Sequence, residues 1–300
     1  MPDSSSPRLR PAPPTPALLS DIVSRALAED LSGGDITSDA TVGPDVRALG
    51  VALTKAALCA CGSSVAQAVF RAVDPELEFE TLVVDGTWVP SQRPLWEVRG
   101  HARSILMAER TALNFVQHLS GIATLAHRFM REIPVGSGTR ISDTRKTTPG
   151  LRALERYAVR AGGAHNHRDN LGSAVLIKDN HIVAAGGIVT AVTRARARAA
   201  HTTKIEIEVA TLEQVEQALA AGVDVIMLDN FELTEIRKAV TLVAGRALIE
   251  VSGNVTIERV ADLARAGADV ISVGALTHSA PAVDISLGVR VPLPERPSAA

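Results

Sequence analysis

Short apolar runs alternate with amphipathic segments along the second half of the chain. The runs are rich in Val, Ile and Leu, which is typical of strands buried on both faces of a parallel sheet. They lie in TRISD, SAVLI, KIEIEVA, VDVIMLDN, ALIEVSGN and DVISVGAL. Helical patterns separate them at IVTAVTRARARAA, TLEQVEQALAAG, LTEIRKAVTLVAG and TIERVADLARAGA. Alternation of strand and helix every twenty to thirty residues or so predicts a series of βαβ units (roughly 30 residues each).

Polar residues and glycines gather at one end of these predicted strands. Following the strands in order, they are Arg145 and Lys146, Lys178, Glu208, Asp229, Ser252 with Gly253 and Asn254, and Gly274. In α/β barrels the carboxyl ends of the strands carry the catalytic groups. Six repeats are fewer than the eight of a full barrel. We therefore expect an incomplete α/β barrel of about six to seven strands, with a doubly wound open sheet as the alternative.

The N-terminal part of the chain has a different pattern. LLSDIVSRALAED predicts an amphipathic helix, and GGDITSDAT a turn-rich link. The strand-like stretches ALGVALTKAALCACG and LWEVRGHARSIL enclose a helix at SSVAQAVFRAVD. A long amphipathic helix, or two, follows over residues 107–133. This mixture of patterns predicts a separate α+β domain.

These patterns set the expected domain boundaries. We expect an N-terminal α/β sandwich at residues 18–125, completed by residues 281–292, and a catalytic α/β barrel at residues 126–280. The Pro- and Ser-rich ends, residues 1–17 and 293–300, are expected to be disordered tails.

Composition and charge narrow the classes of function. Hydrophobic residues make up 46% of the chain and aromatic residues 3%, so the core must be aliphatic. The formal net charge of -2 argues against general binding to nucleic acid or to membrane surfaces. No apolar stretch approaches the ~20 residues of a membrane-spanning helix. Cys59 and Cys61 are too few for a disulfide framework, and we expect reduced thiols in a cytoplasmic protein.

Two kinds of site could use the residues around the SAVLI run. His165, His167 and His181 offer imidazoles, but the density of Arg and Lys beside them is unfavourable to a zinc ion. Lys178 follows the buried run directly, where a desolvated amine could attack a carbonyl and form a Schiff base. Neighbouring cations such as Arg168 favour binding of anionic substrate groups, and they argue against the Schiff-base mechanism.

A pocket for anions accounts for more of these residues. Guanidinium and ammonium groups bind carboxylates and phosphates, and this chain supplies Arg145, Lys146, His167, Arg168 and Lys178. Small residues at 252–254 and 273–276 would let backbone N–H groups cradle a phosphate. Glu208 and Asp229 could hold ribose hydroxyls, hydrated Mg²⁺ or a developing positive charge. The set predicts a site where a phosphorylated sugar meets an acidic small molecule.

Several stretches resemble the quinolinate phosphoribosyltransferase family. The most specific are TRKTTPGLR and IKDNH within SDTRKTTPGLRALERYAVRAGGAHNHRDNLGSAVLIKDNH. Further matches are ALAEDLSGGDITSDAT, AERTALNFVQHLSGIAT, IEIEVATLEQ, IMLDNF, IEVSGNV and ISVGALTHS. They run in order from about Leu18 to about Leu287, which is almost the whole chain.

The resemblance implies an activity and an assembly. Phosphoribose would pass from phosphoribosyl pyrophosphate to the nitrogen of quinolinate with Mg²⁺ present, and loss of CO2 and pyrophosphate would give nicotinate mononucleotide for NAD biosynthesis. It also implies an α/β-sandwich domain beside an incomplete barrel, in a head-to-tail homodimer that shares its active sites and can assemble further. A nicotinate-type phosphoribosyltransferase, a Schiff-base lyase using Lys178 and a non-catalytic ligand-sensing barrel remain the alternatives.

The resemblance also implies residue roles. Arg110 would reach quinolinate across the dimer interface, and Arg145, Lys146, His167 and Arg168 would hold its two carboxylates. Lys146 and Lys178 would lie near the phosphates, and Glu208 and Asp229 would bind the ribose hydroxyls and the metal, directly or through water. The 5′-phosphate would rest on Ser252, Gly253, Asn254, Gly274 and Ala275. The expected catalytic residues are Lys146, Lys178, Glu208 and Asp229; His165 receives no role.

Overall fold

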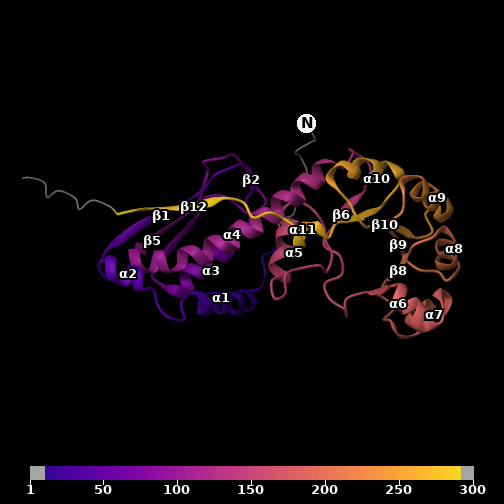
Figure 1. The fold of residues 1–300 in the computed structure, drawn as a ribbon, viewed down its shortest axis with the longest axis horizontal. Coiled ribbons are helices and arrows are strands. Elements are labelled where there is room, and N and C mark those ends of the chain that lie inside the picture. Colours follow the sequence, from indigo (N-terminus) through magenta and orange to yellow (C-terminus); the bar gives the residue numbers. More distant parts are fainter. Residues whose placement is uncertain (1–10, 292–300) are drawn as a thin grey trace, which may run out of the picture. The chain divides into compact units, whose positions relative to one another are not determined.

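The computed structural model describes residues 11–291, and they form two compact units (Figure 1). The barrel unit comprises Ala126–Thr147 and Gly163–Ser279. The N-terminal unit comprises residues 11–125, Thr148–Gly162 and residues 280–291. Most of the first predicted tail and all of the second lie outside the described residues, but Pro16 already begins helix α1 (Pro16–Asp30).

A parallel sheet of six strands forms the centre of the barrel unit within the described residues, in the order β6-β11-β10-β9-β8-β7. The strands are β6 (Arg140–Ser142), β7 (Val175–Ile177), β8 (Ile205–Val209), β9 (Val225–Asp229), β10 (Leu248–Ser252) and β11 (Val270–Ser272). Each falls within one of the six predicted runs, and every pairing is parallel. The expected incomplete α/β barrel is confirmed.

Helices follow the strands and cover the outside of this sheet (Figure 1). They are α6 (Asp179–Ala185), α7 (Ile188–Arg198), α8 (Leu212–Ala220), α9 (Leu233–Val243), the 3₁₀ turn η1 (Ile257–Arg259), α10 (Val260–Ala266) and α11 (Ala275–His278). Thr211 caps α8 by accepting the Gln214 N–H. Gly267 ends α10 at φ 102°, a left-handed conformation that favours glycine.

The N-terminal unit contains an antiparallel sheet in the order β12-β1-β5-β3. Its strands are β1 (Arg47–Thr54), β3 (Glu78–Thr81), β5 (Pro94–His101) and β12 (Ile285–Arg290), and β2 (Leu58–Cys59) pairs with β4 (Trp88–Val89). Helix α3 (Ser63–Val73) contributes Phe70, whose ring meets the buried Trp96 edge-on at 5.3 Å between centroids. β12 comes from the segment predicted to complete this domain.

Two local features of this unit differ from the sequence pattern. Residues 36–41 form helix α2 (Ile36–Thr41) where we predict a turn-rich link, because the Asp35 carboxylate accepts the Ser38 N–H and caps a helix start. The apolar stripe read as one helix or two is a single helix, α4 (Ala102–Arg131).

Helix α5 (Arg152–Ala161) belongs to the N-terminal unit, although it lies within the range expected for the barrel domain. The Tyr157 hydroxyl donates to Asp85 at 2.7 Å. The fully buried Glu155 lies 2.8 Å from the His118 ring nitrogen and also accepts the Thr148 N–H. The contacts with Asp85 and His118 join residues that are 72 and 37 positions apart, so local periodicity does not reveal them.

Candidate active site

A cavity of about 590 Å³ opens at the carboxyl ends of the parallel strands. The expected site residues that line it are Arg145, Lys146, His167, Arg168, Lys178, Glu208, Asp229, Ser252, Gly253 and Asn254. The cationic and acidic side chains that we predict at the ends of different strands therefore line the same cavity.

Three expected site residues are not among those that line this cavity. Gly274 lies close to it, because a Cβ added there would be 3.2 Å from Cδ of Lys146. Ala275 follows as the first residue of α11. Arg110 is exposed on α4, in the N-terminal unit.

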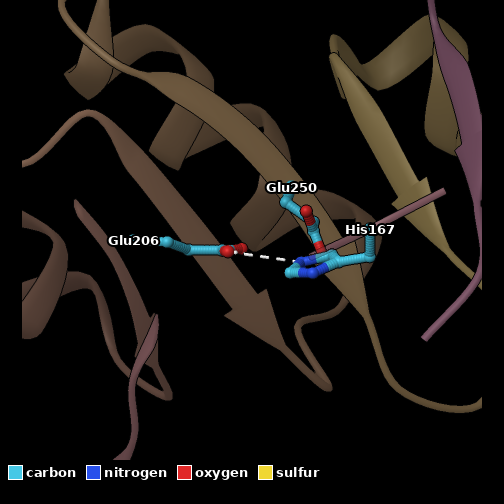
Figure 2. A group of neighbouring side chains, drawn as sticks. All are labelled: His167, Glu206 and Glu250. Atoms are coloured by element: carbon cyan, nitrogen blue, oxygen red, sulfur yellow. Dashed lines mark ion pairs between the residues drawn. The ribbon is translucent and has the colours of Figure 1, made fainter. Parts of the chain in front are cut away.

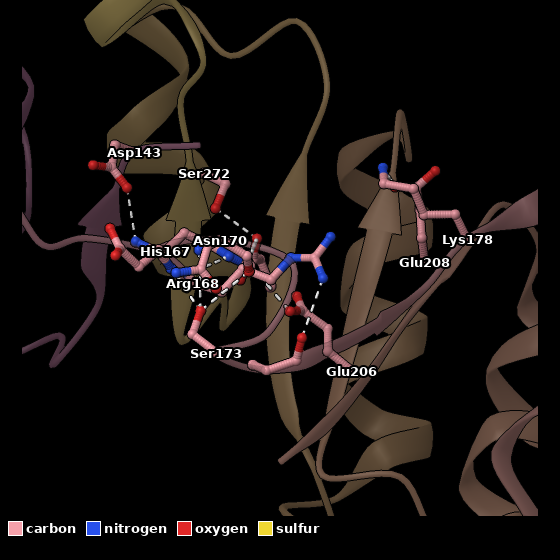
Figure 3. Close-up of polar contacts among 12 residues, drawn as sticks. Asp143, His167, Arg168, Asn170, Ser173, Lys178, Glu206, Glu208 and Ser272 are labelled. Carbon is pink, nitrogen blue, oxygen red and sulfur yellow. Dashed lines mark hydrogen bonds and ion pairs between the residues drawn. The ribbon is translucent and has the colours of Figure 1, made fainter. Parts of the chain in front are cut away.

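Alternate residues of a strand face the same side, so the cavity wall has two layers. We call the layer at Glu206 and Glu250 the inner layer, and the layer at Glu208 and Ser252, which come two residues later, the outer layer. Glu206 and Glu208 share one face of β8, and Glu250 and Ser252 share one face of β10. Figure 3 shows Glu206 directed toward His167 and Arg168, while Glu208 lies beside Lys178. Glu206, Glu250 and Ser272 were not singled out from the sequence. Their place two residues before Glu208, Ser252 and Gly274 is the signal that would have found them.

An ion pair occupies the outer layer. Lys178 Nζ lies 2.5 Å from Oε2 of Glu208. Strands β7 and β8 pair with Ile177 opposite Ile207, which brings the two following residues side by side. Burial and the charge of Glu208 raise the pKa of Asp229, against the Asn230 hydrogen bond and the charges of Lys178 and Lys146. The outer layer is thus a close mixture of acids and cations.

The turns after β9 and β10 are locked together. Asn230 and Asn254 have left-handed backbones, with φ 59° and φ 46°. The Asn230 N–H donates to the Ser252 carbonyl at 3.0 Å, and Asn254 Nδ2 donates to Oδ1 of Asn230. A Cβ at Gly253 (φ 96°) would lie 2.2 Å from that same Oδ1. Only glycine fits here, and successive turn N–H groups of this kind form anion-binding concavities.

Two guanidinium groups stand close together in the inner layer. Burial and the neighbouring charge of Arg145 lower the pKa of Arg168, while Glu206 partly offsets them. Arg168 Nη1 donates to the Ala174 carbonyl at 3.1 Å. The buried Nε of Arg145 has no hydrogen-bond partner among residues 11–291. Adjacent guanidiniums with an unsatisfied donor are suited to a ligand with carboxylate groups.

His167 lies between two glutamates (Figure 2). Nε2 is 3.2 Å from Oε2 of Glu206 and 3.4 Å from Oε1 of Glu250. Burial lowers the pKa of His167, but hydrogen bonds to the two carboxylates and their charges outweigh burial and raise it to about 10. The backbone N–H of Arg168 is directed at Nδ1 of His167 at 2.7 Å. Burial and the charge of Glu250 raise the pKa of Glu206, against the effect of His167.

This cluster is also the group of side chains best placed to hold a metal among the described residues, with its ligand atoms within 4.8 Å of one another. The guanidinium of Arg168, which interacts electrostatically with both Arg145 and Glu206, places positive charge beside this cluster, and such charge disfavours a bound cation. None of the helices in residues 11–291 has the length and apolar composition needed to cross a bilayer.

Comparisons with known proteins give matches to one family along nearly the whole chain. The family model described as the C-terminal domain of quinolinate phosphoribosyl transferase matches residues 122–288, and the N-terminal domain model matches residues 35–120. The nicotinate-nucleotide pyrophosphorylase [carboxylating] of Mycobacterium leprae is 43% identical over 273 residues, covering 89% of this chain and 95% of the relative. A probable enzyme of the same name from Bacillus subtilis is 38% identical over 271 residues, covering 90% and 93%. The crystal structure of NadC from Streptococcus pyogenes superposes with a TM-score of 0.89 at 41% identity, covering 93% of this chain and 99% of that one.

Proposed function

This chain belongs to the quinolinate phosphoribosyltransferase family, and we propose that the cavity at its strand ends carries out the family reaction. The enzyme is a pentosyltransferase of NAD biosynthesis. It transfers phosphoribose from phosphoribosyl pyrophosphate to the quinolinate nitrogen and releases CO2 and pyrophosphate, giving nicotinate mononucleotide. The observation that carries the assignment of the site is that paired guanidiniums, an acidic rim and a glycine turn meet in one cavity.

The inner layer is the proposed quinolinate subsite. Arg145, Lys146 and Arg168 would bind the two carboxylates, with His167 in the same wall. A dianion would relieve the repulsion between the two guanidiniums and satisfy Nε of Arg145. A ligand with a single carboxylate would leave part of this charge unpaired, which favours quinolinate over nicotinate.

The outer layer is the proposed phosphoribosyl subsite. The turn at residues 252–254, together with Gly274 and Ala275, would hold the 5′-phosphate, and Glu208 and Asp229 would hold the ribose hydroxyls. Lys178 and Lys146 would face the pyrophosphate. Lys178 and Glu208 pair with each other in this structure, and both are proposed to contact the phosphoribosyl donor. Their ion pair must therefore rearrange when the donor binds.

The donor set of the outer layer fits Mg²⁺. Magnesium prefers oxygen ligands and retains several waters, and Glu208 and Asp229 provide carboxylates open to the cavity. Burial and the charge of Glu208 raise the pKa of Asp229, as expected of two neighbouring carboxylates that a cation would stabilise. When bound, Mg²⁺ would neutralise charge on the pyrophosphate, and Glu208 and Asp229 are the residues that would hold it, directly or through water.

We propose that the rate enhancement is electrostatic. As the bond to pyrophosphate breaks, the ribose becomes cation-like; Glu208 and Asp229 face that charge and Lys178 and Lys146 face the departing anion. The quinolinate nitrogen then forms the new bond to ribose. Its positive charge lets the ring accept the electron pair left as CO2 departs, and a proton from solvent completes the new C–H bond. Decarboxylation therefore follows transfer.

We also propose a homodimer with shared sites and a cytoplasmic location. Arg110 is exposed on α4, as expected of a residue that reaches the partner's quinolinate. Cys59 and Cys61 are both free thiols and buried, which suits a reducing compartment. Sedimentation should give a dimer or a multiple of it, and Arg110→Ala should weaken quinolinate binding without unfolding the protein.

One incubation tests the function. Purified protein with quinolinate, phosphoribosyl pyrophosphate and Mg²⁺ should form nicotinate mononucleotide and release CO2. CO2 released without the phosphoribosyl donor would contradict the proposed order of steps. Equal or faster use of nicotinate would favour the nicotinate-type alternative, and borohydride trapping of substrate on Lys178 would favour the lyase. If no product forms in the presence of all three components, the result would favour the alternative of a non-catalytic, ligand-sensing barrel.

A further inference from the structure

The loop that carries Arg145 and Lys146 is tied at two points of its backbone. Oγ1 of Thr277 on α11 donates to the Lys146 carbonyl at 2.8 Å. Thr148 donates its N–H to Oε2 of Glu155, in the first turn of α5, at 3.1 Å. Only two residues separate Thr148 from Arg145, so the place of this N–H limits the path of the loop.

We propose that Glu155 is a positioning residue: its buried carboxyl group binds the Thr148 N–H and thereby fixes the loop that presents Arg145 to the diacid. This inference rests on the proposed function, since it takes Arg145 and Lys146 as ligands of quinolinate. Glu155 is not among the residues that line the cavity at the strand ends, so it acts through the loop and not by contact with substrate.

The carboxyl group of Glu155 has a separate partner for each oxygen. Its side chain is 0% exposed, Oε2 accepts the Thr148 N–H, and Oε1 lies 2.8 Å from Nε2 of His118 on α4. Burial of a carboxyl group is unfavourable unless the group is hydrogen-bonded, so both contacts are needed for this geometry. The orientation of Glu155 is therefore set by the fold of the N-terminal unit.

Close packing does not hold this end of the loop. Thr148, Pro149 and Gly150 are all exposed. A cavity of about 380 Å³ in the N-terminal unit borders Thr148 and Leu151, so neighbouring side chains leave open space there. Apart from the turn in which the Leu151 N–H donates to the Thr148 carbonyl, the hydrogen bond to Glu155 is the polar contact that restrains Thr148 within residues 11–291.

A fixed loop matters because a guanidinium binds a carboxylate through two parallel hydrogen bonds of defined geometry. A side chain on a loosely held loop loses more freedom when the ligand binds, which weakens affinity. Within the loop, the Lys146 N–H donates to Oγ1 of Thr144 at 3.1 Å. The Thr147 N–H donates to the Arg145 carbonyl at 2.9 Å. These short-range contacts keep the loop compact, so that restraint at Thr148 reaches Arg145.

Amide hydrogen exchange of the ligand-free protein, followed by NMR, tests the contact without catalysis. Thr148 and Gly150 are exposed residues of the same loop, but the Gly150 N–H has no hydrogen-bond partner among residues 11–291. We expect the Thr148 amide to be protected about tenfold or more relative to the Gly150 amide, and Glu155→Ala to abolish the difference. Equal protection of the two amides in the wild-type protein, or protection of Thr148 that appears only with quinolinate, would overturn the proposal.

Substitutions at Glu155 measure the effect on binding. Glu155→Ala offers Thr148 no acceptor, whereas the amide oxygen in Glu155→Gln can still accept the N–H. We expect Glu155→Ala to weaken quinolinate binding about three- to tenfold, the effect of one lost hydrogen bond, and Glu155→Gln to restore most of it. Isothermal titration with quinolinate gives the dissociation constants. A Gln variant as weak as the Ala variant, or an Ala variant that binds like the wild type, contradicts the role.

Tyr157→Phe is the matched control on the same helix. Tyr157 lies two residues after Glu155, and its hydroxyl donates to Asp85 at 2.7 Å, away from the loop in sequence. Removing this hydroxyl should lower the melting temperature and leave the affinity for quinolinate unchanged. If Tyr157→Phe weakens binding as much as Glu155→Ala does, the effect comes from general loosening of α5, and the positioning role is wrong.

A double-mutant cycle with Arg145 separates action through the loop from any other route. If Glu155 acts through Arg145, then adding Glu155→Ala to Arg145→Ala should weaken quinolinate binding by less than about twofold. Independent, multiplicative effects of the two substitutions would contradict the proposal.

Glu155→Asp covers the case in which Glu155→Ala does not fold. It keeps a buried carboxyl group, but the side chain is one methylene too short to span both Thr148 and His118. Quinolinate binding should weaken as in the Ala variant, and unchanged affinity would contradict the role of Glu155.

The outcome is separable from that of the proposed function. If the wild-type protein forms no nicotinate mononucleotide, the proposed function fails, while amide exchange in the ligand-free protein still decides whether Glu155 holds Thr148. If the protein is active and Thr148 exchanges like Gly150, the positioning role fails and the function stands.

Discussion

Lys178 and Glu208 form an ion pair in the outer layer of the cavity, with Nζ 2.5 Å from Oε2 (Figure 3). The Lys178 side chain is 45% exposed and that of Glu208 18% exposed. Pairs this open to water contribute at most about 1 kcal/mol to stability. The pair therefore serves the site more than the fold, and its partners should matter mainly for turnover.

Lys178→Ala and Glu208→Ala should each lower kcat/KM for phosphoribosyl pyrophosphate by on the order of 10²-fold. The melting temperature should change little. Steady-state kinetics and thermal unfolding of both variants check this. A large fall in melting temperature without a kinetic effect would mean that the pair is structural.

Arg145→Ala should raise the KM for quinolinate by about 30-fold or more, because removing one partner from a desolvated charge pair costs about 2–5 kcal/mol. The KM for phosphoribosyl pyrophosphate should be unaffected. Arg145→Lys should restore little, since an ammonium lacks the fork that binds a carboxylate. Isothermal titration with quinolinate measures the effect, and unchanged affinity would remove Arg145 from the site.

The residues that sequence reasoning located are those that end an apolar run. Lys178, Glu208 and Asp229 interrupt a buried strand at its carboxyl end, where a parallel sheet collects functional groups. Strand order and the meeting of these ends in one cavity then follow from the βαβ repeat.

The residues that it missed are hidden inside those runs. Glu206 and Glu250 sit among Ile and Val, and nothing local shows that two buried acids from different strands share one histidine. The place of α5 depends on Tyr157 meeting Asp85, a contact across 72 positions. Pairing across such separations is a property of the folded chain, which a local pattern does not encode.

Gly253→Ala should disrupt the turn that is expected to bind phosphate. The added Cβ would lie 2.2 Å from Oδ1 of Asn230 and would also require a left-handed alanine, a strain of about 1–3 kcal/mol. We expect a lower melting temperature and weaker binding of phosphoribosyl pyrophosphate. Gly136→Ala is the control: it is also left-handed, at φ 82°, but a Cβ there meets nothing within 4 Å. Equal effects of the two variants would show that strain alone, and not the contact with Asn230, is responsible.

Asp229→Asn should separate stability from activity. Burial and the charge of Glu208 raise the pKa of Asp229 above its ordinary value of 3.8. A carboxyl with a raised folded pKa favours folding while it is protonated, and it loses that contribution as the pH rises through the folded pKa. At neutral pH the ionised Asp229 therefore opposes folding. The amide removes this repulsion, so the melting temperature at pH 7 should hold or rise, while kcat/KM falls by on the order of 10²-fold.

The same reasoning gives the pH dependence of the wild-type enzyme. Its KM for phosphoribosyl pyrophosphate should increase as the pH falls toward the raised pKa of Asp229, because the protonated acid no longer binds the cation-like ribose or Mg²⁺. Raising the Mg²⁺ concentration should move this increase to lower pH, since the cation favours the ionised form. Steady-state kinetics across this pH range check the prediction for the wild-type enzyme. Thermal unfolding of Asp229→Asn checks the stability prediction, with Asp262→Asn as the control at an exposed carboxylate. A melting temperature that falls in Asp229→Asn would contradict the repulsion between Asp229 and Glu208.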